Sequence, residues 1–185
     1  MSLEKIFKKK VEKADNENCI KVINSEVKIL DIFSVYKYLL RKFKPGNFYI
    51  MDLTRWREEM LKYLSSYRPK QEEVETLYEK INSYENKHRA FNGVFLTAVV
   101  QHMFNSGEKK IKLKNIDADF FGFSLEGKAK ERLSLEIERL EGNFCFWCCE
   151  NCDVKIGKFF GSNSFCSFKN CKFDGEFLGF WNFTC

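Results

Sequence analysis

The tetrapeptide Arg139-Leu140-Glu141-Gly142 is echoed nineteen positions later by Lys158-Phe159-Phe160-Gly161. Two further copies can be aligned on their glycines, at residues 119–122 (DFFG) and 176–179 (EFLG), so that the four glycines lie 20, 19 and 18 residues apart. The positions before the glycine repeat as well, since Leu135 and Ile137 precede Gly142 as Val154 and Ile156 precede Gly161. The second half of the chain is therefore built from copies of one β-rich unit.

Self-similarity near 20 residues predicts stacked β-strands, because each copy then places a like side chain one strand spacing, about 4.8 Å, from the previous copy. Leu140, Phe159 and Phe177 are expected to form one buried row. Phe160, one residue later on the alternating period, is expected to face outward. An irregular β-solenoid is the architecture that this periodicity favours.

A shorter period runs through the last copies. Residues 168, 173, 178 and 183 are Phe, Phe, Leu and Phe, and Cys166 and Cys171 each stand two residues before a Phe. Over about residues 166–183 this pattern resembles a pentapeptide-repeat protein. The resemblance implies a right-handed, four-sided β-helix that buries the central Phe or Leu of each pentapeptide and a small residue two positions earlier. Glu176 and Trp181 depart from the small position.

The first half of the chain shows helical periodicity. Helices are predicted over about 29–43, from an N-cap at Asp52 to about 67, over about 70–90, and from an N-cap at Asn92 to about Asn105. The last of them is apolar nearly all round, so it is expected to be central to a small bundle. The predicted fold class is α+β, with an N-terminal helical bundle followed by an irregular right-handed β-solenoid.

Charge changes at the same place as periodicity. Residues 1–110 carry 21 Lys and Arg against 15 Asp and Glu, whereas residues 111–185 carry 10 against 11. The apolar period changes to two from Lys110 onward. Two domains are therefore predicted, a basic helical one over 1–108 and a Phe- and Cys-rich β-repeat one over 109–185.

Several classes of protein are disfavoured. The N-terminus lacks the apolar run of a secretory signal, and the longest apolar stretch, around Val94 to Phe104, is too short to span a bilayer, so a cytoplasmic protein without a membrane span is expected. No phosphate loop, nucleophile elbow or dinucleotide fingerprint is present, so an enzyme is not supported. The Lys- and Glu-rich composition resembles that of proteins from heat-adapted prokaryotes.

Seven of the eight cysteines lie within the last 41 residues. Cys149, Cys152, Cys166 and Cys171 have the C-x2-C-x13-C-x4-C spacing, which is close to a zinc ribbon, and four thiolates would satisfy tetrahedral Zn²⁺. Cysteine is also an ordinary small apolar core residue. Structural cysteines, with no cofactor, are the preferred interpretation, and zinc is the alternative.

The leading functional hypothesis is a non-catalytic interaction or scaffold protein that binds a protein partner or associates with itself. Its contacts are expected from exposed aromatic residues, Phe160, Phe180 and Trp181. The alternative hypothesis is a metal-dependent nucleic-acid-binding protein in which zinc is held by the cysteines and the basic half meets the phosphates.

Overall fold

The computed structural model describes residues 32–46, 48–65, 67–84 and 87–178. Four helices are followed by four strands, so the α+β class is confirmed. The helices are α3 (Ile32–Phe43), α4 (Ile50–Leu64), α5 (Gln71–Tyr84) and α6 (Arg89–Asn105), and the strands are β1 (Lys110–Asp117), β2 (Leu133–Glu141), β3 (Cys152–Phe160) and β4 (Lys172–Leu178). The chain divides into two compact units, Met1–Asp31 and Ile32–Cys185, and all described residues belong to the second unit.

The two predicted N-caps differ from what the structure shows. Asp52 lies inside α4, where its carboxylate accepts a hydrogen bond from the Tyr49 backbone N–H at 2.8 Å, three residues back. Asn92 lies inside α6, buried, and its Oδ1 accepts a hydrogen bond from the Tyr36 hydroxyl at 2.8 Å. Both side chains satisfy a donor, but Asn92 joins two helices instead of starting one.

The strands form one parallel sheet in the order β1-β2-β3-β4. Leu140 pairs with Phe159 and Phe159 with Phe177, which confirms the predicted row. Phe159 is 1% exposed and Phe160 is only partly buried, as the alternation requires.

The glycine-based alignment is wrong for the first copy of the repeat. Ile116, not Phe120, pairs with Leu140, and Ala118 donates a backbone hydrogen bond to Glu141, next to Gly142. The connection from β1 to β2 is longer than the next one, since Lys110 pairs with Ser134 but Ser134 pairs with Asp153. A small antiparallel turn between Lys128 and Glu131 takes up part of the extra length.

The expectation of a β-solenoid, and with it the resemblance to pentapeptide-repeat proteins, is wrong, because the described chain forms an open four-stranded parallel sheet after a helical region. The residues at the five-residue period are also not buried as the resemblance requires. Phe168 is 36% exposed and Leu178 is 44% exposed, although the resemblance requires both to be central and buried. Phe183 lies outside the described residues.

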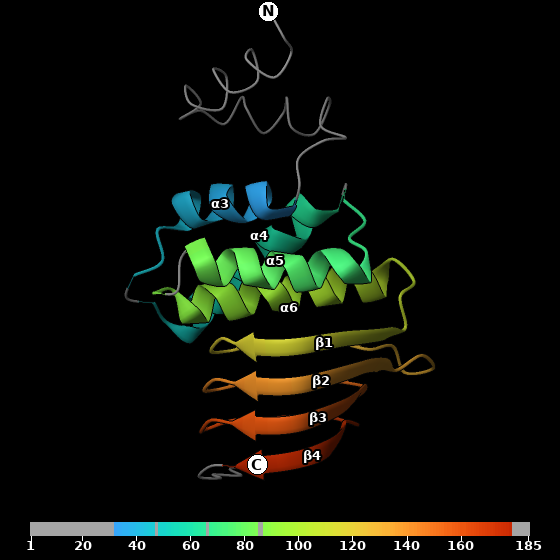
Figure 1. The fold of residues 1–185 in the computed structure, drawn as a ribbon. Helices are drawn as coiled ribbons and strands as arrows, with labels where there is room; N and C mark the ends of the chain where they lie inside the picture. Colours follow the sequence, from blue (N-terminus) through green and yellow to red (C-terminus); the bar gives the residue numbers. More distant parts are fainter. Residues whose placement is uncertain (1–31, 47, 66, 85–86, 179–185) are drawn as a thin grey trace, which may run out of the picture. The chain divides into compact units, whose positions relative to one another are not determined.

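The helices cover one edge of the sheet, beyond β1, and β4 forms the other edge (Figure 1). Side chains of α5 pair with the backbone of β1 as a neighbouring strand would. The Gln71 amide accepts a hydrogen bond from Lys112 N–H at 3.0 Å and donates one to the Lys112 carbonyl, and the Tyr78 hydroxyl accepts one from Asp117 N–H at 2.6 Å.

Side chains of α6 make the same kind of hydrogen bond to the backbone of the connection after β1. The Thr97 hydroxyl accepts a hydrogen bond from Gly122 N–H at 2.7 Å. The Gln101 amide accepts one from Glu126 N–H and donates one to the Glu126 carbonyl, each at 2.8 Å. Helical side chains therefore satisfy backbone groups that a fifth strand would otherwise pair.

One buried core runs through helices and strands of Ile32–Cys185. At Gly93 the backbone of α6 comes so near the chain after β1 that an added Cβ would lie 1.9 Å from the Asp119 carbonyl oxygen. Glycine is required at that contact. A boundary between separate domains at 108/109 remains a prediction.

Candidate functional site

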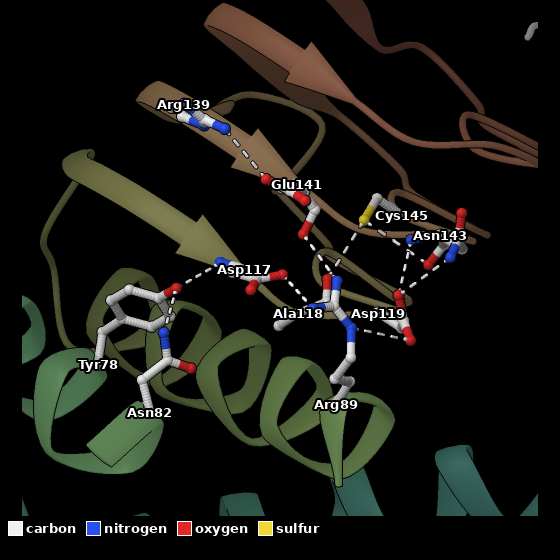
Figure 2. Close-up of polar contacts among 10 residues, drawn as sticks. All are labelled: Tyr78, Asn82, Arg89, Asp117, Ala118, Asp119, Arg139, Glu141, Asn143 and Cys145. Carbon is white, nitrogen blue, oxygen red and sulfur yellow. Dashed lines mark hydrogen bonds and ion pairs between the residues drawn. The ribbon is translucent and has the colours of Figure 1, made fainter. Parts of the chain in front are cut away.

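A cluster of polar contacts lies where β1 ends, around Arg89, the first residue of α6 (Figure 2). The Arg89 guanidinium forms an ion pair with Asp117 and a second one with Asp119, whose Oδ2 is 3.4 Å from Nε. It also donates a longer hydrogen bond, of 3.4 Å, to the Glu141 carbonyl. One helix residue therefore binds the ends of both β1 and β2.

Neighbouring groups complete this cluster. Asn82 donates to the Tyr78 hydroxyl at 2.8 Å, and Asp119 accepts from Asn143 N–H at 2.8 Å. Burial opposes the charge of Arg89, but Asp119 and Asp117 outweigh it and raise the pKa of the guanidinium. Because the charged groups meet each other, the cluster serves to fix α5 and α6 on the sheet and offers little to a substrate.

A second charged residue is buried between helices. Arg57 of α4 is 8% exposed, donates to Gln101 Oε1 at 3.2 Å, and lies 3.8 Å from the Glu126 carboxylate. Burial lowers its pKa, against the attraction of Glu126. Its guanidinium group is positioned by the hydrogen bond to Gln101, the same residue that pairs with the Glu126 backbone.

Of the cysteines of the predicted zinc site, Cys149 lies in the connection before β3, Cys152 begins β3, and the other two lie in the connection before β4. Cys149 is buried, and its thiol lies 3.0 Å from the Gly122 carbonyl, to which it donates. The thiol of Cys166, also buried, lies 3.8 Å from the Ser164 carbonyl. Burial raises the pKa of Cys149, which keeps that thiol protonated. These positions suit core cysteines.

Cys152 and Cys171 are brought together. The pairs on either side of them are in register, because Asn151 N–H donates to the Lys169 carbonyl and Asp153 pairs with Lys172. Cys152 therefore faces Cys171 across adjacent strands. The interaction between the two thiols raises the pKa of Cys152 and lowers the pKa of Cys171. The Cys152 thiol also lies 3.2 Å from the Glu150 carbonyl oxygen, and the Cys171 thiol lies 3.4 Å from the Lys169 carbonyl oxygen.

The arrangement has a cation beside it. Arg132 donates two hydrogen bonds to the Asp153 carboxylate, of 2.8 and 2.7 Å, and a third, of 3.0 Å, to the Cys152 carbonyl. Its charge adds to the lowering of the pKa of Cys171. Cys171 is only partly buried, whereas Cys152 is fully buried, so one thiol of the pair faces solvent.

Among the residues that the structure describes, no three His, Cys, Asp or Glu side chains lie close enough together to hold a metal ion. Each sulfur of the predicted zinc set lies instead within hydrogen-bond distance of a backbone carbonyl oxygen. Zinc binding by these four residues remains a prediction without support from their placement.

Of the predicted contact residues, Phe160 lies on the outward side of β3, partly exposed, with the Arg139 guanidinium 4.7 Å from its ring centroid. Phe180 and Trp181 lie outside the described residues. The structure instead exposes three consecutive apolar residues that the sequence did not single out, Tyr49, Ile50 and Met51, at the start of α4.

Sequence reasoning missed the roles of Arg89, Asp117 and Arg132. No motif marks them, because each meets its partner only through the fold. The signal that could have been used is the register: once β1 is placed beside β2, Asp117, the last residue of β1, lies opposite Glu141, and Asp119 follows two residues later. Arg132 could have been found in the same way, since it directly precedes β2.

Within the described part of the chain, no helix is long and apolar enough to cross a membrane. No family model matches the chain, and searches of curated proteins and of solved structures found no match either. The functional argument therefore depends on the geometry of this chain alone.

Proposed function

We propose that the protein is a non-catalytic scaffold that associates with a second copy of itself through the free edge of β4. The observation that carries the proposal is the contrast between the two edges of the sheet. Side chains of α5 occupy the backbone of β1, but no described residue pairs with the far side of β4. An unpaired strand edge is a template for another strand.

The exposure of β4 supports an unfinished sheet. In β3 the inward residues Val154, Ile156 and Phe159 are at most 2% exposed, as expected for a strand with neighbours on both sides. In β4 the residues paired with them are less covered: Phe173 and Phe177 are only partly buried, and Gly175 is exposed. A further strand beside β4 would cover apolar surface that the described chain leaves in contact with water.

The charges of β4 suit a second copy. The strand reads Lys172-Phe-Asp-Gly-Glu-Phe-Leu178. If two such strands pair antiparallel about a two-fold axis at Asp174, Lys172 of each copy lies opposite Glu176 of the other. The two central Asp174 carboxylates repel each other, and the flanking lysines offset that repulsion as diagonal neighbours.

Sedimentation velocity over a concentration series of the full chain tests this proposal. The wild-type chain is expected to dimerise. Lys172→Glu and Glu176→Lys should each weaken the dimer, because each places like charges opposite one another, and the double exchange should restore it. Lys80→Glu, at an exposed position of α5 beside the opposite edge of the sheet, is the matched control and should leave the association unchanged.

A chain that is monomeric at every concentration would contradict the proposal. Single variants that weaken the dimer without rescue by the double exchange would contradict the antiparallel register about Asp174.

A further inference from the structure

We infer that Cys171 and Cys152 form a redox-active dithiol that reacts with small-molecule disulfides, Cys171 being the attacking thiol and Cys152 the resolving one. The inference does not depend on the proposed self-association. It rests on three observations: the two residues face each other across adjacent strands, only Cys171 of the pair is open to solvent, and Arg132 stands beside them.

The register brings the two residues within bonding range. Neighbouring strands lie about 4.8 Å apart, and a disulfide accepts Cα separations of about 4.4–6.8 Å. Asp153 pairs with Lys172, so Cys152 and Cys171 stand at paired positions one residue earlier, and side chains at paired positions of parallel strands point to the same face. A bond between them therefore needs little movement of the backbone.

The surroundings separate the two roles. The hydrogen bond from Cys152 and the charge of Arg132 stabilise the thiolate of Cys171, which is the nucleophilic form. Arg132 is itself held by Asp153 and by the Cys152 carbonyl, so its position is set. Cys152 is buried and can be reached by Cys171 but not by a molecule in solution.

The chemistry balances in two exchanges. The Cys171 thiolate attacks one sulfur of RS–SR, the S–S bond breaks, and RS⁻ leaves and takes up the proton that Cys171 had lost. Cys152 then gives up its proton and attacks the Cys171 sulfur, the mixed disulfide breaks, and a second RS⁻ leaves and is protonated. The external disulfide is reduced to two RSH, and the dithiol is oxidised.

The second step is helped by the first. The pKa of Cys152 is raised chiefly by its hydrogen bond to the Cys171 sulfur. Once Cys171 carries RS as a mixed disulfide, its sulfur has no negative charge to attract that proton. That cause of the raised pKa of Cys152 is then removed, and burial is the main cause that remains.

Two other buried thiols have different surroundings. Cys145 and Cys149 donate to the carbonyls of Ala118 and Gly122, and burial raises the pKa of each. Cys148 is exposed and serves as an internal comparison, because it is as open to a reagent as any thiol of the described chain.

The test is incubation of the native full chain with oxidised glutathione, followed by acid quenching, alkylation in denaturant and peptide mapping by mass spectrometry. The expected product is a Cys152–Cys171 disulfide. Cys152→Ser should instead accumulate the glutathione mixed disulfide on Cys171, and Cys148→Ser, the matched control, should give the same Cys152–Cys171 product as the wild type.

Arg132→Gln tests the positioning role of the arginine. The alkylation rate of Cys171 at neutral pH should fall several-fold, and the pH midpoint of that rate should rise, while Cys148 should be unaffected. A wild-type chain in which Cys171 ends as a stable mixed disulfide, bonds to Cys148 or Cys149, or stays reduced while Cys148 reacts would overturn the inference.

Discussion

At the scale of single residues, the inward face of the sheet contains a row of paired apolar side chains, formed by Leu140, Phe159 and Phe177. Phe159 packs against Phe165 and Phe177, with ring centroids 5.2 and 6.4 Å away. Phe159→Ala should lower the free energy of unfolding by about 3–5 kcal/mol, because a buried aromatic is lost and a cavity remains. Urea unfolding measures the change.

Phe160 is the matched control for this prediction. It is the next residue along the strand, and its ring is covered by Arg139. Phe160→Ala should therefore cost about 0.5–1 kcal/mol, the size of an exposed cation–π contact. Equal losses for the two variants would mean that the register of β3 is wrong.

At the scale of elements, α5 acts as the neighbour that β1 lacks. Gln71→Ala should free the N–H and carbonyl of Lys112 and lower stability by about 1 kcal/mol, the usual net value of such hydrogen bonds. Hydrogen exchange of the Lys112 amide should accelerate. Glu72→Ala, in the same helical turn, should change neither quantity.

Gln71→Glu separates the contributions of the two hydrogen bonds to stability. Its carboxylate keeps an acceptor for the Lys112 N–H but has no donor for the Lys112 carbonyl. Its stability should lie between those of the wild type and of Gln71→Ala. An alanine variant as stable as the wild type would show that the side chain does not substitute for a strand.

Much of this element-level picture was predictable. The strand register from β2 to β4 follows from the repeat, because Leu135, Ile137 and Leu140 meet Val154, Ile156 and Phe159 in the same alternation. The register of β1 was not predictable from glycines, since Gly122 belongs to the turn after the strand and the connection to β2 is longer.

The same limit applies to the candidate sites. The spacing of the cysteines suggested a zinc ribbon, but the fold pairs Cys152 with Cys171 and turns Cys149 toward a carbonyl. The five-residue period suggested a four-sided helix, but its members at 168 and 178 are among the exposed apolar residues. Spacing along the chain does not report which strand comes to lie beside which.

At the scale of the whole molecule, the described unit is asymmetric. One edge of its sheet is closed by helices through Gln71, Tyr78, Thr97 and Gln101, and the other edge is a strand with mixed charges and partly exposed aromatic residues. A sheet closed at one end and open at the other can add a strand at the open end only. Association through β4 is the central claim.

The most direct measurement of that claim is hydrogen exchange of residues 172–178 in the full chain at concentrations below and above the dimer transition. We expect the amides of this strand that do not donate to β3 to gain protection only at the higher concentration, while residues 110–117, paired with β2 and covered by α5, remain protected at both. Residues 172–178 that exchange at the same rate at both concentrations would contradict the claim.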